Sequence, residues 1–230
     1  MNGIVKKLLT WLVLPVIIVA LVYAIVNSIM QPVRFNKEKD FREEVAVQRL
    51  KDIRTLQVAF KSVYNRFSPT VDSLKDFYNN GQMAVIMQVG SSDDSLAVAH
   101  TDAVKKANKK LTAQDLYQMY LDGDKNLVFK VENKIPVKDT LFNGRPDFCI
   151  DSLNFIPFCG EPVIMESIIK MVSGVPVPLF EAKMPYRSLL KGLDNQLRIN
   201  LDAERRDQNK YEGLQVGSVS APNNNAGNWE

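Results

Sequence analysis

The sequence predicts an α+β protein in which a membrane-spanning helix precedes a folded domain. Three observations carry this prediction: an uncharged apolar run near the N-terminus, an amphipathic run directly after it, and two β-rich runs joined by a two-residue turn. We expect a transmembrane helix that continues into an amphipathic stalk helix, followed by an antiparallel sheet covered by helices. The expected segments are a short N-terminal tail (1–7), the transmembrane helix (8–30), the stalk helix (33–67), the α+β domain (68–219) and a flexible tail (220–230).

The run over 8–30 carries no charge, and its only clearly polar side chains are Thr10, Asn27 and Ser28. A helix of this length spans roughly 30 Å, about the thickness of the hydrocarbon core of a bilayer. Trp11 and Tyr23 are the candidate membrane-interface residues, since aromatic rings favour that depth. A cleaved signal peptide is the alternative, but the run exceeds a usual signal sequence and no small-x-small cleavage site closes it. We expect a retained anchor.

The orientation of this anchor rests on basic residues and on cysteines. Lys6 and Lys7 precede the span and several basic residues follow it, so the positive-inside rule does not decide. Cys149 and Cys159 flank a short loop and are predicted to form a disulfide, which would place the domain outside the cytoplasm. Two buried thiols, packed as small apolar residues, are the alternative.

The stalk over 33–67 reads as one amphipathic helix. Apolar residues recur at steps of three and four and form the expected packing face, which consists of Leu50, Ile53, Leu56, Phe60, Val63 and Phe67. Charged residues lie mainly off this stripe, so one face of the helix should pack and the other should meet water. Pro69 is expected to end the helix because the residue before a proline avoids the helical region, and Asn65 can adopt a positive φ in the turn.

This N-terminal region, up to about residue 78, resembles that of type IV pilins and type II secretion pseudopilins. The residues that carry the resemblance are the apolar helix, its amphipathic continuation, and Tyr64, Asn65, Phe67 and Pro69 in the turn that ends it. Gly3 is followed by Ile4, and Leu8 stands where the family has a glutamate, so prepilin processing is not implied. The chain is similar to unprocessed, pilin-like envelope proteins of Bacteroidetes. A plain transmembrane anchor with a helical stalk is the alternative.

The resemblance implies a single-pass protein of a bacterial inner membrane with its C-terminal domain in the periplasm. It also implies contact with the lipid bilayer and with protein partners, or self-association, through the N-terminal helix.

The first half of the domain is expected to hold a buried strand at 83–89, helix over 95–120 and a half-buried strand at 126–132. Thr112 is a candidate helix cap within the helical region. The basic cluster Lys105, Lys106, Lys109 and Lys110 is interpreted as a solvated helix face or loop.

The second half holds the clearest hairpin, in which Ser173 and Gly174 join two β-rich runs. Pro176 and Pro178 lack amide donors, which predicts an edge strand. Pro185 then opens a helix with leucines at every fourth position, and a short strand follows over 213–219. The polar tail after it is expected to be flexible, with Trp229 unordered.

The composition excludes several classes of function. The net charge is only +3, with 29 basic and 26 acidic residues, so nucleic acid is not an expected partner. A single histidine, His100, and two cysteines predict no metal site, and no motif predicts a cofactor. Asp122, Asp124 and Asn126 have the spacing of a calcium loop, but the glycine and closing glutamate are missing, so a turn is expected.

Anchoring and packing surfaces are therefore visible in the sequence, whereas catalytic residues are not. This favours a noncatalytic envelope protein that acts as a structural or docking component of a membrane-associated assembly. The alternative is a membrane-anchored hydrolase that acts on envelope or cell-wall material through carboxylates brought together by the fold. A third reading is a ligand-binding sensor.

Overall fold

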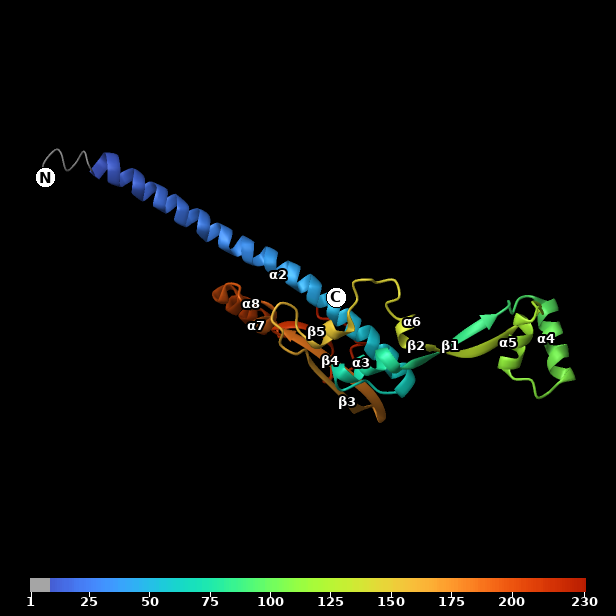
Figure 1. The fold of residues 1–230 in the computed structure, drawn as a ribbon. Coiled ribbons are helices and arrows are strands. Elements are labelled where there is room, and N and C mark those ends of the chain that lie inside the picture. Colours follow the sequence, from blue (N-terminus) through green and yellow to red (C-terminus); the bar gives the residue numbers. More distant parts are fainter. Residues whose placement is uncertain (1–8) are drawn as a thin grey trace.

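The computed structural model describes residues 9–230 and is elongated, with a long N-terminal helix at one end (Figure 1). The predicted tail 1–7 and residue 8 lie outside the described residues. The protein combines helices with antiparallel sheets, as expected. In chain order the elements are η1 (Leu9–Val13), α2 (Leu14–Tyr64), α3 (Val71–Asn80), β1 (Gln82–Val89), α4 (Ser95–Ala107), α5 (Ala113–Leu121), β2 (Phe129–Pro136), α6 (Val137–Thr140), η2 (Ile150–Asn154), β3 (Ile164–Val172), β4 (Val175–Pro185), α7 (Tyr186–Leu189), α8 (Asn195–Asp207) and β5 (Gly213–Gly217).

The anchor and the stalk form one continuous helix, α2, which a π-helical turn, η1, precedes. Pro32 lies inside α2, so the predicted boundary between 8–30 and 33–67 is not a break. A proline removes a single backbone hydrogen bond, and regular turns on both sides keep the helix intact. We refer to residues 33–64 of α2 as the stalk.

The stalk ends at Tyr64, three residues before the predicted end. Asn65 adopts the left-handed conformation (φ +55°), and its N–H donates to the carbonyl of Lys61 at 2.8 Å. The following turn is fixed by the buried Gln57, whose side-chain amide donates to the carbonyl of Ser68 and accepts from its N–H, both at 2.8 Å. These contacts turn the chain back toward the domain.

The predicted packing face lies largely against the domain. Leu50, Ile53 and Leu56 are fully buried, and Phe60 and Phe67 are nearly so, although Phe67 lies beyond the helix end. Val63 is 37% exposed and is not part of the buried face, contrary to the prediction. The reason is that α3 covers the last turn from another side, where Phe77 packs on Phe60 and Tyr64.

The main sheet has the order β3-β4-β5 and is antiparallel throughout. The predicted hairpin is confirmed: Val172 pairs with Val175, and the two turn residues between them both have positive φ. One face of the sheet packs on α2 and forms the main core with buried side chains of β4 and β5, which are Phe180, Ala182, Met184, Leu214 and Val216.

The prediction of an edge strand at Pro176 and Pro178 is only locally right. β4 is the central strand, but β5 pairs only with Glu181–Pro185. The two prolines lie in the part of β4 that β5 does not reach, where no neighbouring strand needs their missing amides.

The helix predicted after Pro185 is divided into α7 and α8. Gly192 has φ +86° in the turn between them, and Asp194 caps α8 by accepting from the N–H of Leu197 at 2.9 Å. Asp194 also accepts from Gln31 Nε2 at 2.5 Å. The start of α8 is thereby held beside the end of the apolar part of α2, which we define as residues 14–30.

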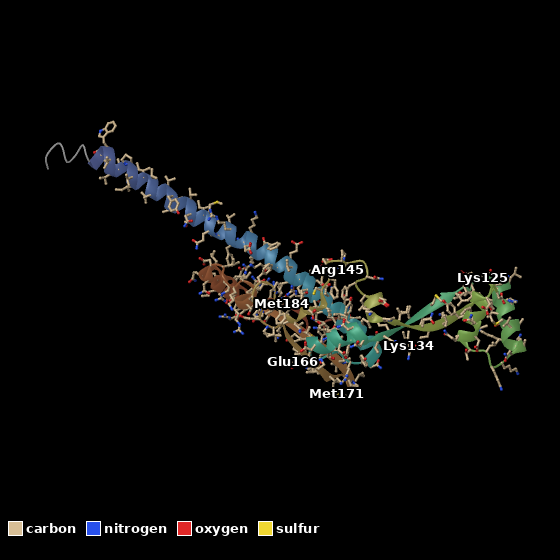
Figure 2. The ribbon with its side chains drawn as sticks, viewed as in Figure 1. Lys125, Lys134, Arg145, Glu166, Met171 and Met184 are labelled. Atoms are coloured by element: carbon tan, nitrogen blue, oxygen red, sulfur yellow. The ribbon has the colours of Figure 1, made fainter. Side chains whose placement is uncertain are left out.

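The second sheet is separate from the first, which the sequence did not predict. β1 and β2 form a two-stranded antiparallel ribbon that extends away from α2 and carries α4 and α5 at its far end (Figure 1). Figure 2 shows Lys134 on this ribbon and Lys125 beyond it, well away from Met184 in the main body. We call residues 90–128 the knob.

The knob has a small core of its own. Two of its buried residues, Leu116 and Leu127, lie in the knob itself. The other three, Val89, Phe129 and Val131, lie at the adjoining ends of β1 and β2, and none of the five belongs to the main core. The predicted helical region divides into α4 and α5, and Thr112 caps α5 in a capping box with Asp115.

The C-terminal tail is not free of the domain, contrary to the prediction for 220–230. Gly227 bridges to Val216 beside β5, and Trp229 packs partly buried against the main core. Glu230 forms an ion pair with Arg54 of the stalk at 2.6 Å. The tail is held by contacts with residues far from it in the sequence. Its polar composition does not predict such contacts.

Candidate functional site

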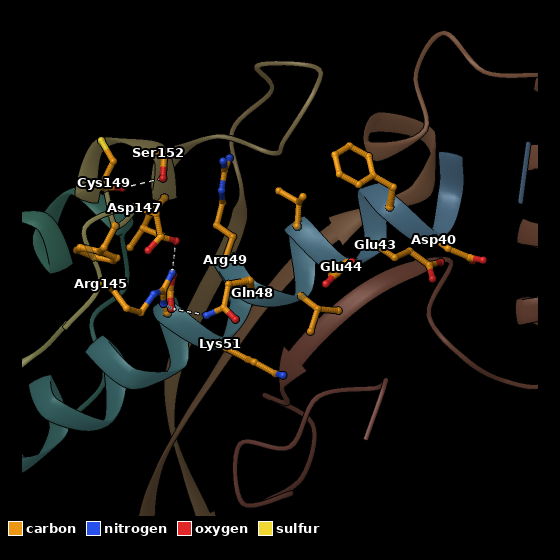
Figure 3. A pocket seen from close by; sticks show the side chains of 16 residues that line it. Asp40, Glu43, Glu44, Gln48, Arg49, Lys51, Arg145, Asp147, Cys149 and Ser152 are labelled. Carbon is orange, nitrogen blue, oxygen red and sulfur yellow. Dashed lines mark hydrogen bonds and ion pairs between the residues drawn. The ribbon is translucent and has the colours of Figure 1, made fainter. Parts of the chain in front are cut away.

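A cleft of about 780 Å³ lies between the stalk and the loop that leads into η2 (Figure 3). The stalk contributes one wall, residues 40–52, and the other wall comes from residues 145–153. Its lining mixes charged side chains of both signs with a few apolar ones, so its chemistry depends on which charges are paired.

Asp52 is the buried carboxylate at one end of this cleft. It accepts from Arg145 Nη1 at 2.5 Å and from Gln48 Nε2 at 3.0 Å. Arg145 also contacts Asp147 through Nη2 at 3.3 Å. The hydrogen bond to Asp52 raises the pKa of Arg145, and the hydrogen bond from Arg145 lowers the pKa of Asp147. The ion pair between Arg145 and Asp52 fastens the loop to the stalk, and the contact with Asp147 holds Arg145 within the loop.

Arg49 fastens the same wall at a second point. Its guanidinium donates to the carbonyl of Phe155. Burial lowers the pKa of Arg49, and the charge of Asp52 opposes this change. The guanidinium is therefore committed to the joint between stalk and domain.

The predicted disulfide between Cys149 and Cys159 is absent, and both are free thiols. Cys149 is exposed at the cleft. Cys159 lies in the tight turn after Ile156, where its sulfur accepts from the N–H of Glu161 at 3.5 Å. The loop between them contains the helical turn η2, which places the two side chains in different environments. The placement of the domain outside the cytoplasm thus loses the support of a disulfide.

A second set of polar contacts lies nearer the apolar part of α2. The buried Tyr186 donates its hydroxyl hydrogen to Glu43 Oε1 at 2.6 Å and accepts from Arg205 Nη2 at 2.9 Å. Burial and then the hydrogen bond to Glu43 raise the pKa of Tyr186. Arg42 donates to the carbonyl oxygens of Leu189 and Lys191 at 3.1 and 3.0 Å. The stalk is thus fastened to α7 and α8 as well.

The Tyr186 hydroxyl should make stability sensitive to alkaline pH. Because the pKa of Tyr186 is raised in the folded state, its contribution is fully present below about pH 10 and is lost as pH rises above that value. Tyr186→Phe should lower the free energy of unfolding at pH 8 by about 1–2 kcal/mol and make the alkaline loss shallower. Denaturant unfolding from pH 8 to 11 measures both effects.

Tyr64→Phe is the matched control for this variant, because Tyr64 is half exposed. It should leave both the stability at pH 8 and the alkaline loss unchanged. An alkaline loss as steep in Tyr186→Phe as in the unmodified chain would contradict the assignment.

The apolar part of α2 meets the requirements for a membrane span. None of its most apolar stretch is buried inside the protein. Trp11, in the preceding turn η1, and Tyr23, in α2, are both exposed. One helix is therefore long and apolar enough to cross a membrane.

The histidine and the aspartate-rich turn that the sequence singled out meet in the knob. His100 Nε2 lies 2.9 Å from Asp124 Oδ2, and this hydrogen bond lowers the pKa of Asp124. Asp124 also accepts from the N–H of Asn126 at 3.3 Å, as expected for a turn. The contact joins α4 to the segment after α5.

Sequence reasoning missed the polar residues that fasten the stalk. Asp52 lies one helical turn before Leu56. A carboxylate on the packing side of a helix indicates a buried ion pair, and this was the one signal available in the sequence. Its partner, Arg145, lies 93 positions further along the chain, and nothing in the local pattern marks it. Tyr186 and Glu43 were likewise unmarked.

The cleft is therefore a joint between helix and domain. Of its five carboxylates, Asp52, Asp147 and Glu43 accept hydrogen bonds and Asp40 forms an ion pair with Lys39. Within residues 9–230, Glu44 forms neither a hydrogen bond nor an ion pair. Comparison of the chain with protein-family models, with curated proteins and with solved structures gave no match.

Proposed function

We propose that this protein is a noncatalytic, membrane-anchored scaffold that presents the knob as a docking element at a fixed distance from the bilayer. The observation that carries the proposal is the separation of two cores: the main core includes the stalk, whereas the knob has its own core at the end of a ribbon. A module with its own core, held away from the body, has its outer surface free for a partner.

The stalk supports this role through its length and its attachment. At 1.5 Å per residue, α2 rises about 48 Å between Val33 and Tyr64. The ribbon adds roughly 27 Å at 3.4 Å per residue. Ion pairs and a buried helix face join the stalk to the main body, so the main body follows the anchor, and the ribbon carries the knob beyond it.

The location that fits this role is a bacterial inner membrane, crossed once by the apolar part of α2, with the domain in the periplasm. The helix packed on an antiparallel sheet is the arrangement that a pilin-like role requires. Partners then include the lipid bilayer around the apolar part of α2 and other proteins or further copies of the chain beside it. Four of the five carboxylates that line the cleft are paired, and this favours a structural role over hydrolysis.

Removal of the knob tests the proposal. Residues 90–128 are replaced by Asn-Gly, which joins Val89 to Phe129 by a two-residue turn. We expect the melting temperature of the main body to be preserved and the cross-linked complexes formed by the full-length protein in cells to be lost.

The control places the same engineered turn elsewhere, by replacing Ser173 and Gly174 with Asn-Gly. This variant should keep the complexes. Complexes that persist after removal of the knob, with the body folded, would refute the docking role.

A further inference from the structure

The end of α4 carries an exposed basic patch, which we define as Lys105, Lys106, Lys109 and Lys110. The first two lie in the last turn of α4, and the other two lie in the turn that leads to α5. All four are exposed, and none takes part in an ion pair within residues 9–230. The C-terminal dipole of α4 favours cations in its last turn, but it does not account for the two lysines beyond the helix.

Three acidic residues of the knob are used elsewhere in its fold and do not neutralise this patch. Asp94 caps α4 by accepting from the N–H groups of Leu96 and Ala97 at 3.1 and 3.2 Å. Asp115 closes the capping box of α5, and Asp124 binds His100. Helix caps and the turn engage these three carboxylates. Asp102, which precedes Lys105 and Lys106 by three and four positions on α4, offsets only part of the four positive charges, and the remainder is left for a partner.

The exposed face of α4 indicates which kind of anion fits. Leu96 is 83% exposed at the start of the helix, and Ala99 and Ala103, three and seven residues later, are exposed on the same side. A protein helix would bury this apolar strip while acidic residues on its flank met the lysines. A soluble polyanion such as polyphosphate would leave Leu96 in water.

We propose that the outer face of α4 and its basic patch dock an acidic amphipathic helix of a partner protein. This inference rests on the proposed docking role of the knob and names the chemistry of its partner. Charge complementarity would speed association and align the two helices, and burial of Leu96 would slow dissociation of the partner.

The test uses the full-length protein in phosphatidylcholine nanodiscs and two soluble probes. One probe is a helical peptide with a leucine face flanked by glutamates, and the other is polyphosphate of similar charge. The test variant carries Lys→Glu at positions 105, 106, 109 and 110. The matched control carries the same four-charge change at other exposed lysines, Lys37, Lys51, Lys130 and Lys134.

We expect the peptide to bind the unmodified protein and to bind the basic-patch variant at least about tenfold more weakly. The control variant should stay within about twofold of the unmodified protein, and Leu96→Ser should weaken the peptide but not polyphosphate. Equal loss in the two Lys→Glu variants, or peptide binding that is indifferent to Leu96→Ser, would overturn the inference.

A distinct result separates this inference from the proposed function. If removal of the knob abolishes the complexes in cells while the basic-patch variant retains them, the docking role stands and the acidic-helix partner is wrong. If removal of the knob leaves the complexes in place, both fail.

Discussion

Ile53→Ala is expected to lower the free energy of unfolding of the main body by about 2–5 kcal/mol. Ile53 is fully buried in the main core, where the stalk meets the sheet. Its truncation removes apolar contacts and leaves a cavity that packed neighbours on the helix and the sheet cannot fill. Chemical denaturation of the full-length protein in detergent, followed by circular dichroism, measures the loss.

Val58→Ala is the matched control on the same helix, because Val58 is 49% exposed. It should change the free energy of unfolding by no more than about 0.5 kcal/mol. The contrast tests whether the stalk is part of the core or merely lies beside it. Equal effects of the two substitutions would mean that the domain folds without the stalk.

Leu127→Ala is expected to unfold the knob while the main body stays folded. Leu127 is fully buried in a core of five buried residues. Its truncation should cost about 2–5 kcal/mol of unfolding free energy, which is more than the stability expected of so small a unit. The ribbon is the covalent link between the knob and the body, and the two cores share no residue. Hydrogen exchange should therefore lose protection in α4 and α5 alone, with α2 and β4 still protected.

The control is Leu121→Ala, a leucine of the same knob that is 53% exposed. It should preserve protection in α4 and α5. Simultaneous loss of protection in the knob and in the main body of Leu127→Ala would show that the two cores are one cooperative unit, which contradicts the separation on which the docking role rests.

Local patterns in the sequence predicted the elements of the fold that local forces determine. The apolar run, the stripe of the stalk, the cap at Thr112, the turn at Asn65 and the hairpin at Ser173 depend on residues within a few positions of one another. Periodicity and turn chemistry report such short-range effects directly.

The remaining features depend on contacts between distant segments. The continuity of α2 through Pro32 and the docking of Trp229 are tertiary outcomes that composition does not report. The division into two sheets depends on which strands find each other, and β1 pairs with β2 across the whole knob. The disulfide prediction failed because closeness in sequence does not bring two sulfur atoms into bonding geometry.

The candidate site likewise has one part that local sequence patterns predict and one part that they do not. The wall contributed by the stalk lies on a helix that the sequence predicted, so its position was foreseeable. The ion pair between Asp52 and Arg145 joins two segments 93 positions apart, and the hydrogen bond from Tyr186 to Glu43 joins two segments 143 positions apart. Pairings of this kind follow from the folded arrangement and cannot be derived from spacing.

Fluorescence energy transfer in a lipid bilayer can measure how far the stalk and the knob lie from the membrane surface. In a background with Cys149→Ser and Cys159→Ser, a donor is placed either at Lys37→Cys, just beyond the apolar part of α2, or at Ala103→Cys in the knob, with acceptors on the lipid headgroups. We expect strong transfer from position 37 and weak transfer from position 103. Equally strong transfer from both positions, or none from either, would contradict a membrane-inserted helix that holds the knob away from the bilayer.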